Sequence, residues 1–131
     1  MTNFGLIVSF ASADVSFDCW ACLHASENAD LRVVVVDNAS PDDTAAQIRA
    51  WGANQPGRGD LAGFAEFPAN EADTLDFDQF AHVTLLNSAA NLGFAGGNNI
   101  GLRALMRHQE VDLFWVLNPD AMVTPTTAAA Y

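Results

Sequence analysis

The sequence predicts an α/β protein in which a mostly parallel sheet lies between two layers of helices. Strand-like and helix-like segments alternate along the chain, an order that favours right-handed βαβ units. Four consecutive valines, Val33 to Val36, are β-branched and apolar on both faces, as expected for a parallel strand covered by helices on both sides. Polar or glycine-rich residues directly follow three of the strand-like runs. Because ligands bind beyond the carboxyl ends of the strands in such sheets, these residues are candidates for a site.

The length of 131 residues suits one domain, and we assign residues 1–131 to a single unit. With 50% hydrophobic residues, the chain can form a substantial core. No apolar run approaches the roughly 18 residues of a membrane span, and the N-terminus lacks the basic residues of a secretory signal. We expect a cytoplasmic protein without a transmembrane segment, and a peripheral position at the inner face of the membrane is compatible with this expectation.

The first expected elements are a strand, a helix and a second strand. Phe4 to Phe10 is a short apolar run that favours a buried strand. Asp14 can cap a helix that runs from Val15 to about Glu27. Leu31 to Asp37 contains the four valines and is the second strand.

The second helix and a long connection follow. Ser40 is expected to cap a helix with Pro41 at its first position, which then runs through Trp51. From residue 52 to residue 80, glycines and prolines interrupt any long element, and only residues 64–67 resemble a short edge strand. Four carboxylates of this connection are expected to face solvent: Glu71, Asp73, Asp76 and Asp78.

The last third of the chain is expected to form a strand, a polar turn, a helix and a final strand. The strand is His82 to Asn87, and the glycine-rich turn covers residues 91–99. The helix runs from Asn99 to Gln109, and the final strand from Asp112 to Leu117.

The candidate site lies at the carboxyl edge of the predicted sheet. Ser9, Asp37, residues 87–97 and residues 118–120 all follow or end strands, so a parallel sheet brings them to one edge. Glycines in a turn let backbone N–H groups approach a ligand, and the N-terminus of the next helix favours an anion. Some of these residues could equally be ordinary turn residues, since Asp and Asn often terminate strands.

Charge narrows the class of ligand. The net charge is −11, with five arginines, no lysine and sixteen carboxylates, which argues against a nucleic-acid partner. A Walker-type phosphate loop is excluded because it requires a lysine. A phosphate ligand on so acidic a chain would need local positive charge from a metal ion, an arginine or oriented amides. Cys19 and Cys22 could form a redox or zinc pair, but buried thiols on one helix face are the simpler interpretation.

Three motifs resemble those of one known family. They are Val-Val-Val-Asp-Asn-Ala-Ser at 34–40, Asn-Leu-Gly-Phe-Ala-Gly-Gly-Asn-Asn at 91–99 and Leu-Asn-Pro-Asp at 117–120. In this order they resemble the nucleotide-sugar-binding part of the inverting family 2 glycosyltransferases, which have the GT-A fold. The middle motif is similar to bacterial enzymes that transfer rhamnose or galactofuranose to cell-surface polysaccharides.

The resemblance implies a role for each matching residue. Asp37 would accept a hydrogen bond from a pyrimidine base, as in a UDP- or dTDP-sugar, with Ser9 close to the base. Asp120 would be the ligand of a divalent metal, Mg or Mn, beside Asn118, which replaces the first acid of the family's Asp-x-Asp motif. The nucleotide and sugar would also contact four residues of the glycine-rich segment: Asn91, Gly93, Gly96 and Gly97.

The reaction implied is metal-assisted transfer of a sugar to a glycan acceptor, with inversion at the anomeric carbon. The catalytic base is unknown and is expected beyond Tyr131, in an acceptor-binding half that follows. The residues at 9–12, Ser-Phe-Ala-Ser, also depart from the family's usual Thr-Tyr-Asn. We therefore expect a truncated GT-A domain that is inactive alone and forms a homodimer through exposed apolar surface.

Two other interpretations remain open. A non-catalytic α/β binding or interaction module would keep the scaffold without donor chemistry, and nucleotide binding would distinguish it from an enzyme fragment. A dinucleotide-binding oxidoreductase or a flavodoxin-like domain is the third possibility. The oxidoreductase is disfavoured because the first strand is followed by Ser-Phe-Ala-Ser rather than by a Gly-x-Gly-x-x-Gly turn.

Overall fold

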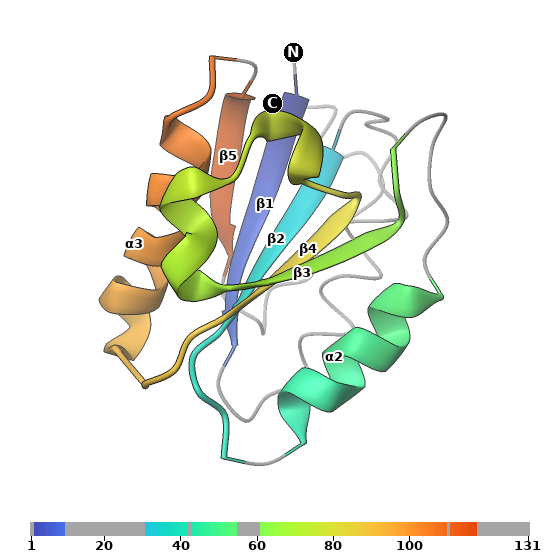
Figure 1. Ribbon diagram of the computed structural model, residues 1–131. Coiled ribbons are helices and arrows are strands. Elements are labelled where there is room, and N and C mark those ends of the chain that lie inside the picture. Colours follow the sequence, from blue (N-terminus) through green and yellow to red (C-terminus); the bar gives the residue numbers. More distant parts are fainter. Residues whose placement is uncertain (1, 10–30, 42, 55–60, 110, 118–131) are drawn as a thin grey trace.

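The computed structural model describes residues 2–9, 31–41, 43–54, 61–109 and 111–117, and it contains one five-stranded sheet (Figure 1). The strand order is β3-β4-β2-β1-β5, and every neighbouring pair is parallel. The strands are β1 (Thr2–Ser9), β2 (Leu31–Asp37), β3 (Phe64–Pro68), β4 (Val83–Asn87) and β5 (Val111–Leu117). The predicted parallel α/β fold is thereby confirmed, and the segment 64–67 is an edge strand as expected. The helix predicted from Val15 to Glu27 lies outside the described residues.

The two α-helices that the structure describes lie on opposite faces of the sheet: α2 (Thr44–Ala53) and α3 (Gly93–Met106). The alternation of side chains along β2 assigns Val34 and Val36 to the α3 face, where both are fully buried. The core on this face consists of β2, β4 and α3 side chains with residues of the connection before β4. Its buried members are Val34, Val36, Ala72, Leu75, Phe80, Leu86, Ile100, Ala104 and Leu105.

The other face of the sheet receives α2. An added Cβ on Gly52 would lie 2.1 Å from a ring carbon of Phe64, so the helix packs directly on β3 here. Ile48 of the same helix is fully buried, as are Val33 and Val35 of β2. Burying each of these aliphatic side chains contributes about 1.5–3 kcal/mol. The four valines therefore serve both core layers, as their pattern predicted.

The long connection before β4 is more ordered than the sequence suggested. It contains β3 and two 3₁₀ helices, η1 (Ala69–Thr74) and η2 (Phe77–Gln79). Arg107 holds η1 against the end of α3, since its guanidinium donates to the carbonyls of Ala72 and Leu75. All four carboxylates assigned to solvent are exposed. Of the helices that the structure describes, none is long and apolar enough to cross a lipid bilayer.

Both described α-helices begin at residues other than those predicted. α2 starts at Thr44 rather than at Pro41, with Asp43 at its N-cap. Ser40 does not cap it, because its hydroxyl donates to a carboxylate oxygen of Asp37 instead. α3 starts at Gly93 rather than at Asn99, so most of the glycine-rich segment is helix and not a turn. The sequence pattern missed this because glycine disfavours helix interiors and tertiary contacts overrode that preference.

Candidate functional site

The site is built on the carboxyl ends of adjacent strands, at the lower edge of the sheet in Figure 1. In the strand register, Ser9 pairs with Asp37, Asp37 with Asn87, and Asn87 with Pro68. Four strand ends thus form one row across β1, β2, β4 and β3. The predicted candidates Ser9 and Asp37 are therefore neighbours, as a shared edge requires.

Asp37 is a nearly buried carboxylate, with 4% of its surface exposed. Its Oδ1 accepts a hydrogen bond of 2.5 Å from the Ser40 hydroxyl, and its carbonyl accepts one of 2.9 Å from the Ser88 N–H. Ala39 takes a φ of 60°, a left-handed conformation that is uncommon without glycine. This turn allows Ser40 to fold back on Asp37. An ionised carboxylate only accepts hydrogen bonds, so Asp37 is suited to a ligand that offers an N–H or O–H group.

Asn38 joins the end of β2 to the start of α3, and sequence reasoning did not single it out. Its side-chain oxygen accepts a hydrogen bond of 3.0 Å from the Leu92 N–H, and its amide nitrogen donates one of 2.9 Å to the Gly93 carbonyl. Only 3% of its surface is exposed. The sequence contained the signal that both segments reach one edge, but it did not show that this side chain links them.

The first turn of α3 depends on three of the predicted residues. Asn91 accepts a hydrogen bond of 2.8 Å from the Gly93 N–H, and Gly93 has a φ of +75°, which strains any L-residue. At Gly96, an added Cβ would lie 2.5 Å from the Cβ of Leu92. Gly97 is buried within the helix. Gly93 and Gly96 thus have a role in forming the helix, whereas the sequence interpretation assigned all three glycines to a flexible ligand-binding turn.

A cavity of about 320 Å³ lies beside this edge, on the α3 face. It is lined by the ends of β3 and β4, by the connection to α3, and by Ile100 and Arg103. Arg103 is exposed and lies 3.9 Å from the carboxylate of Asp73, which is also exposed. Among the described residues that line the cavity, Arg103 is the basic one.

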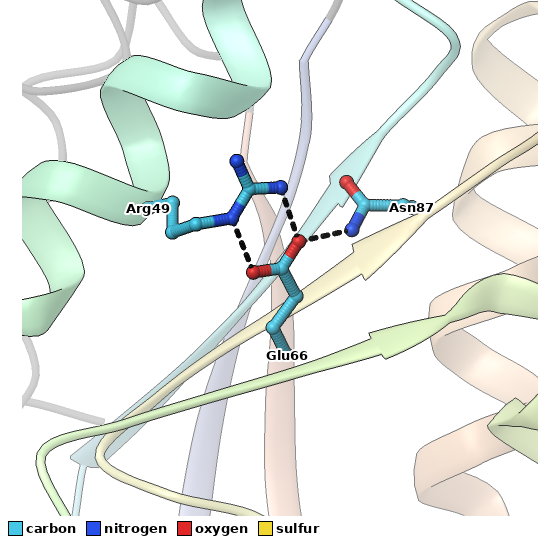
Figure 2. A network of polar contacts seen from close by, with 3 residues as sticks. All are labelled: Arg49, Glu66 and Asn87. Atoms are coloured by element: carbon cyan, nitrogen blue, oxygen red, sulfur yellow. Dashed lines mark hydrogen bonds and ion pairs between the residues drawn. The ribbon is translucent and has the colours of Figure 1, made fainter.

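A charged network supports the end of β4 on the α2 face (Figure 2). Arg49 of α2 donates two hydrogen bonds of 2.6 Å to the carboxylate of Glu66 on β3. The side-chain amide of Asn87 donates a third, also of 2.6 Å, to the same carboxylate. The hydrogen bond from Arg49 holds the pKa of Glu66 below its usual value, the bond from Asn87 and the arginine charge act in the same direction, and partial burial opposes them. The sequence analysis placed Asn87 at the candidate edge, within residues 87–97, but assigned no role to Arg49 or Glu66.

The remaining predicted residues, Asn118 and Asp120, lie outside the described part of the chain, as does any residue beyond Tyr131. Among the described residues, no group of three or more His, Cys, Asp or Glu side chains could hold a metal ion. The described edge supplies one carboxylate, Asp37, together with amide groups. This set suits hydrogen bonds to a ligand and does not by itself form a divalent-metal site.

Neither protein-family models nor curated proteins match this chain. Solved structures do share its fold. A mannosyltransferase from Pyrobaculum calidifontis, PcManGT, in complex with GDP-Man and Mn2+, matches 97% of the chain with a TM-score of 0.65 and 22% identity. TarS from S. aureus, in a structure of residues 1–349, matches 99% with a TM-score of 0.65 and 15% identity.

The chain spans only about 30% of the first of these structures and 32% of the second. Its α/β fold is that of part of the GT-A glycosyltransferases. At identities this low, the likeness shows the fold alone.

Proposed function

We propose that this chain is the donor-binding portion of a glycosyltransferase and that it binds a nucleotide-diphosphate sugar at the carboxyl edge of its sheet. The observation that carries the proposal is the row formed by the ends of β1, β2 and β4, with the carboxylate of Asp37 at its centre, in a fold shared with a mannosyltransferase. Parallel α/β sheets bind ligands at this edge. Asp37 would accept a hydrogen bond from the nucleoside.

The donor proposed from the sequence motifs is a UDP- or dTDP-sugar, transferred with inversion to a glycan acceptor. The mannosyltransferase was solved with GDP-Man, so a guanosine donor belongs in the same test. Asp120 is the proposed ligand of Mg or Mn, a metal that would neutralise charge on the departing diphosphate. With a net charge of −11, the chain needs such compensation to hold a diphosphate. The acceptor site and the base are proposed to lie beyond this chain.

The test is calorimetric titration of UDP, dTDP and GDP into the protein, with and without Mn2+. We expect one nucleotide to bind with metal. We expect Asp37→Asn to weaken that binding about tenfold, because an asparagine amide can turn its N–H groups toward the N–H or O–H group of the nucleoside. Asp120→Ala should remove the metal dependence. Asp78→Asn, which removes an exposed carboxylate near the start of β2, is the control and should bind as the wild type does.

The alternative is a non-catalytic module that keeps the fold without binding a donor. The departure at residues 9–12 favours it, since the first of these residues, Ser9, ends β1 at the same edge. If none of the three nucleotides binds under any metal condition, the donor-binding proposal fails and this alternative stands.

A further inference from the structure

We propose that Glu66, held by Arg49, is a positioning residue of the donor site that turns the carbonyl oxygen of Asn87 toward the nucleoside. The inference rests on the proposed donor-binding function and deepens it. It adds Asn87 as a second hydrogen-bond acceptor beside Asp37, for an N–H or O–H group of the ligand.

The first step concerns the Asn87 amide, which could present either its oxygen or its nitrogen to a ligand. An ionised carboxylate only accepts hydrogen bonds, so the amide must turn its nitrogen to Glu66. The bond of 2.6 Å from Asn87 to Glu66 has this direction. Figure 2 shows the amide oxygen of Asn87 pointing away from Glu66.

The second step concerns what keeps Glu66 in place and ionised. Both of its oxygens accept bonds of 2.6 Å from Arg49, a two-point geometry that fixes a carboxylate better than a single contact does. Only 23% of the Glu66 side chain is exposed, so solvent screens the pair less than at an open surface. The low pKa of Glu66 agrees with a carboxylate that stays charged at neutral pH.

The third step places Asn87 at the candidate site. Asn87 pairs with Asp37 in the register of the parallel strands, so both side chains leave the same face of the sheet on adjacent strands. Glu66 pairs with Leu85, two residues before Asn87, and therefore shares that face. The orientation of one amide thus decides whether the site presents a second acceptor or a donor beside Asp37.

The experiment measures nucleoside-diphosphate affinity for the wild type, Glu66→Gln, Asn87→Asp and the double variant. In Glu66→Gln the side-chain amide can donate to Asn87 and reverse it, so we expect affinity to fall about three- to tenfold, the value of one hydrogen bond. Asn87→Asp sets two carboxylates against each other and should also bind more weakly. The double variant restores a donor–acceptor pair with an oxygen facing the ligand, and should bind within about threefold of the wild type.

The control is Asp78→Asn, which makes the same change of net charge as Glu66→Gln at an exposed residue near the start of β2, and it should leave affinity unchanged. A purely structural network would lower the stability of both single variants but leave the affinity of the folded proteins at the wild-type value, and that result would overturn the inference. A double variant no better than the singles would also overturn it. If the wild type itself binds no nucleotide, the proposed function fails and the inference fails with it. If the wild type binds and the single variants bind equally well, only the inference fails.

A second measurement covers variants that do not fold. In wild-type protein labelled at asparagine, the side-chain carbonyl carbon of Asn87 should shift on saturation with nucleotide, while its amide protons stay bonded to Glu66. Comparison of uridine diphosphate with its N3-methyl and 2′-deoxy forms distinguishes a base N–H from a ribose hydroxyl as the donor. An Asn87 signal that no bound nucleotide shifts would refute the contact.

Discussion

At the residue scale, three asparagines at one edge perform different tasks. Asn38 ties the end of β2 to the start of α3, Asn91 accepts a hydrogen bond from the first residue of that helix, and Asn87 is bonded to Glu66. Each uses an amide that can donate and accept. The sequence pattern identified the segments that carry them, but the partners of the three side chains differ and none was predicted.

Replacement of Asn38 should destabilise the junction between β2 and α3. Asn38→Ala leaves the Leu92 N–H and the Gly93 carbonyl without this partner, and we expect a loss of about 1–3 kcal/mol in the free energy of unfolding. Asn38→Asp keeps an acceptor for Leu92 but no donor for Gly93, so its loss should be intermediate at neutral pH. Urea denaturation measures both, and equal stability of all three proteins would show that the bridge contributes nothing.

Acid should selectively weaken the network around Glu66. Its pKa is lower in the folded than in the unfolded chain, so its contribution is fully present above the unfolded pKa and is lost as pH falls through the lowered folded pKa. The amount is about 1 kcal/mol, because Arg49 is half exposed. As the pH is lowered through the acidic range, the free energy of unfolding should therefore fall less steeply for Glu66→Gln than for the wild type. Parallel curves for the two proteins would contradict the assigned pKa.

At the element scale, the helices are set by packing more than by local propensity. α3 accommodates glycines from its first residue onward, and Gly96 is needed there because Leu92 lies over it. α2 has no side-chain hydrogen bond at its N-cap, and it approaches β3 closely through Gly52. Tertiary contacts with the sheet therefore outweigh the weak helix tendency of these segments.

Substitution of Gly52 tests this packing. Gly52→Ala would gain about 1 kcal/mol of helix propensity, but its methyl group would overlap the Phe64 ring. Overpacking costs about 1–3 kcal/mol, so we expect a net loss of stability. Gly52→Ala in a Phe64→Leu background should cost less than in the wild type, because the smaller side chain leaves room. If Gly52→Ala were more stable than the wild type, α2 would have to lie farther from β3 than the structure places it.

At the scale of the whole molecule, the fold forms one sheet edge that gathers residues distant in sequence. Nearly the whole chain aligns with the two solved structures, but it spans only about a third of their length. Acceptor binding and catalysis are therefore proposed for regions outside this chain. Two large hydrophobic side chains are exposed among the described residues, Leu92 at 53% and Met106 at 69%. They are compatible with the predicted homodimer, which stays a prediction.

Light scattering over a range of protein concentrations tests the homodimer. We expect a mass near twice that of the chain of 14.0 kDa at high concentration. Because hydrophobic contacts drive the expected association, added salt should not dissociate it. A constant mass of one chain at every concentration would contradict the prediction.

The sequence by itself determined the α/β class, the parallel sheet, and the placement of Ser9 and Asp37 at one edge. It could do so because strand periodicity is local and because parallel strands must end on the same side. Only the tertiary structure decided where the helices begin, that Asn38 links β2 to α3, and that Asn87 donates a hydrogen bond to Glu66. The last two features depend on contacts between residues 21 to 55 positions apart, and such contacts leave no periodic trace in the sequence.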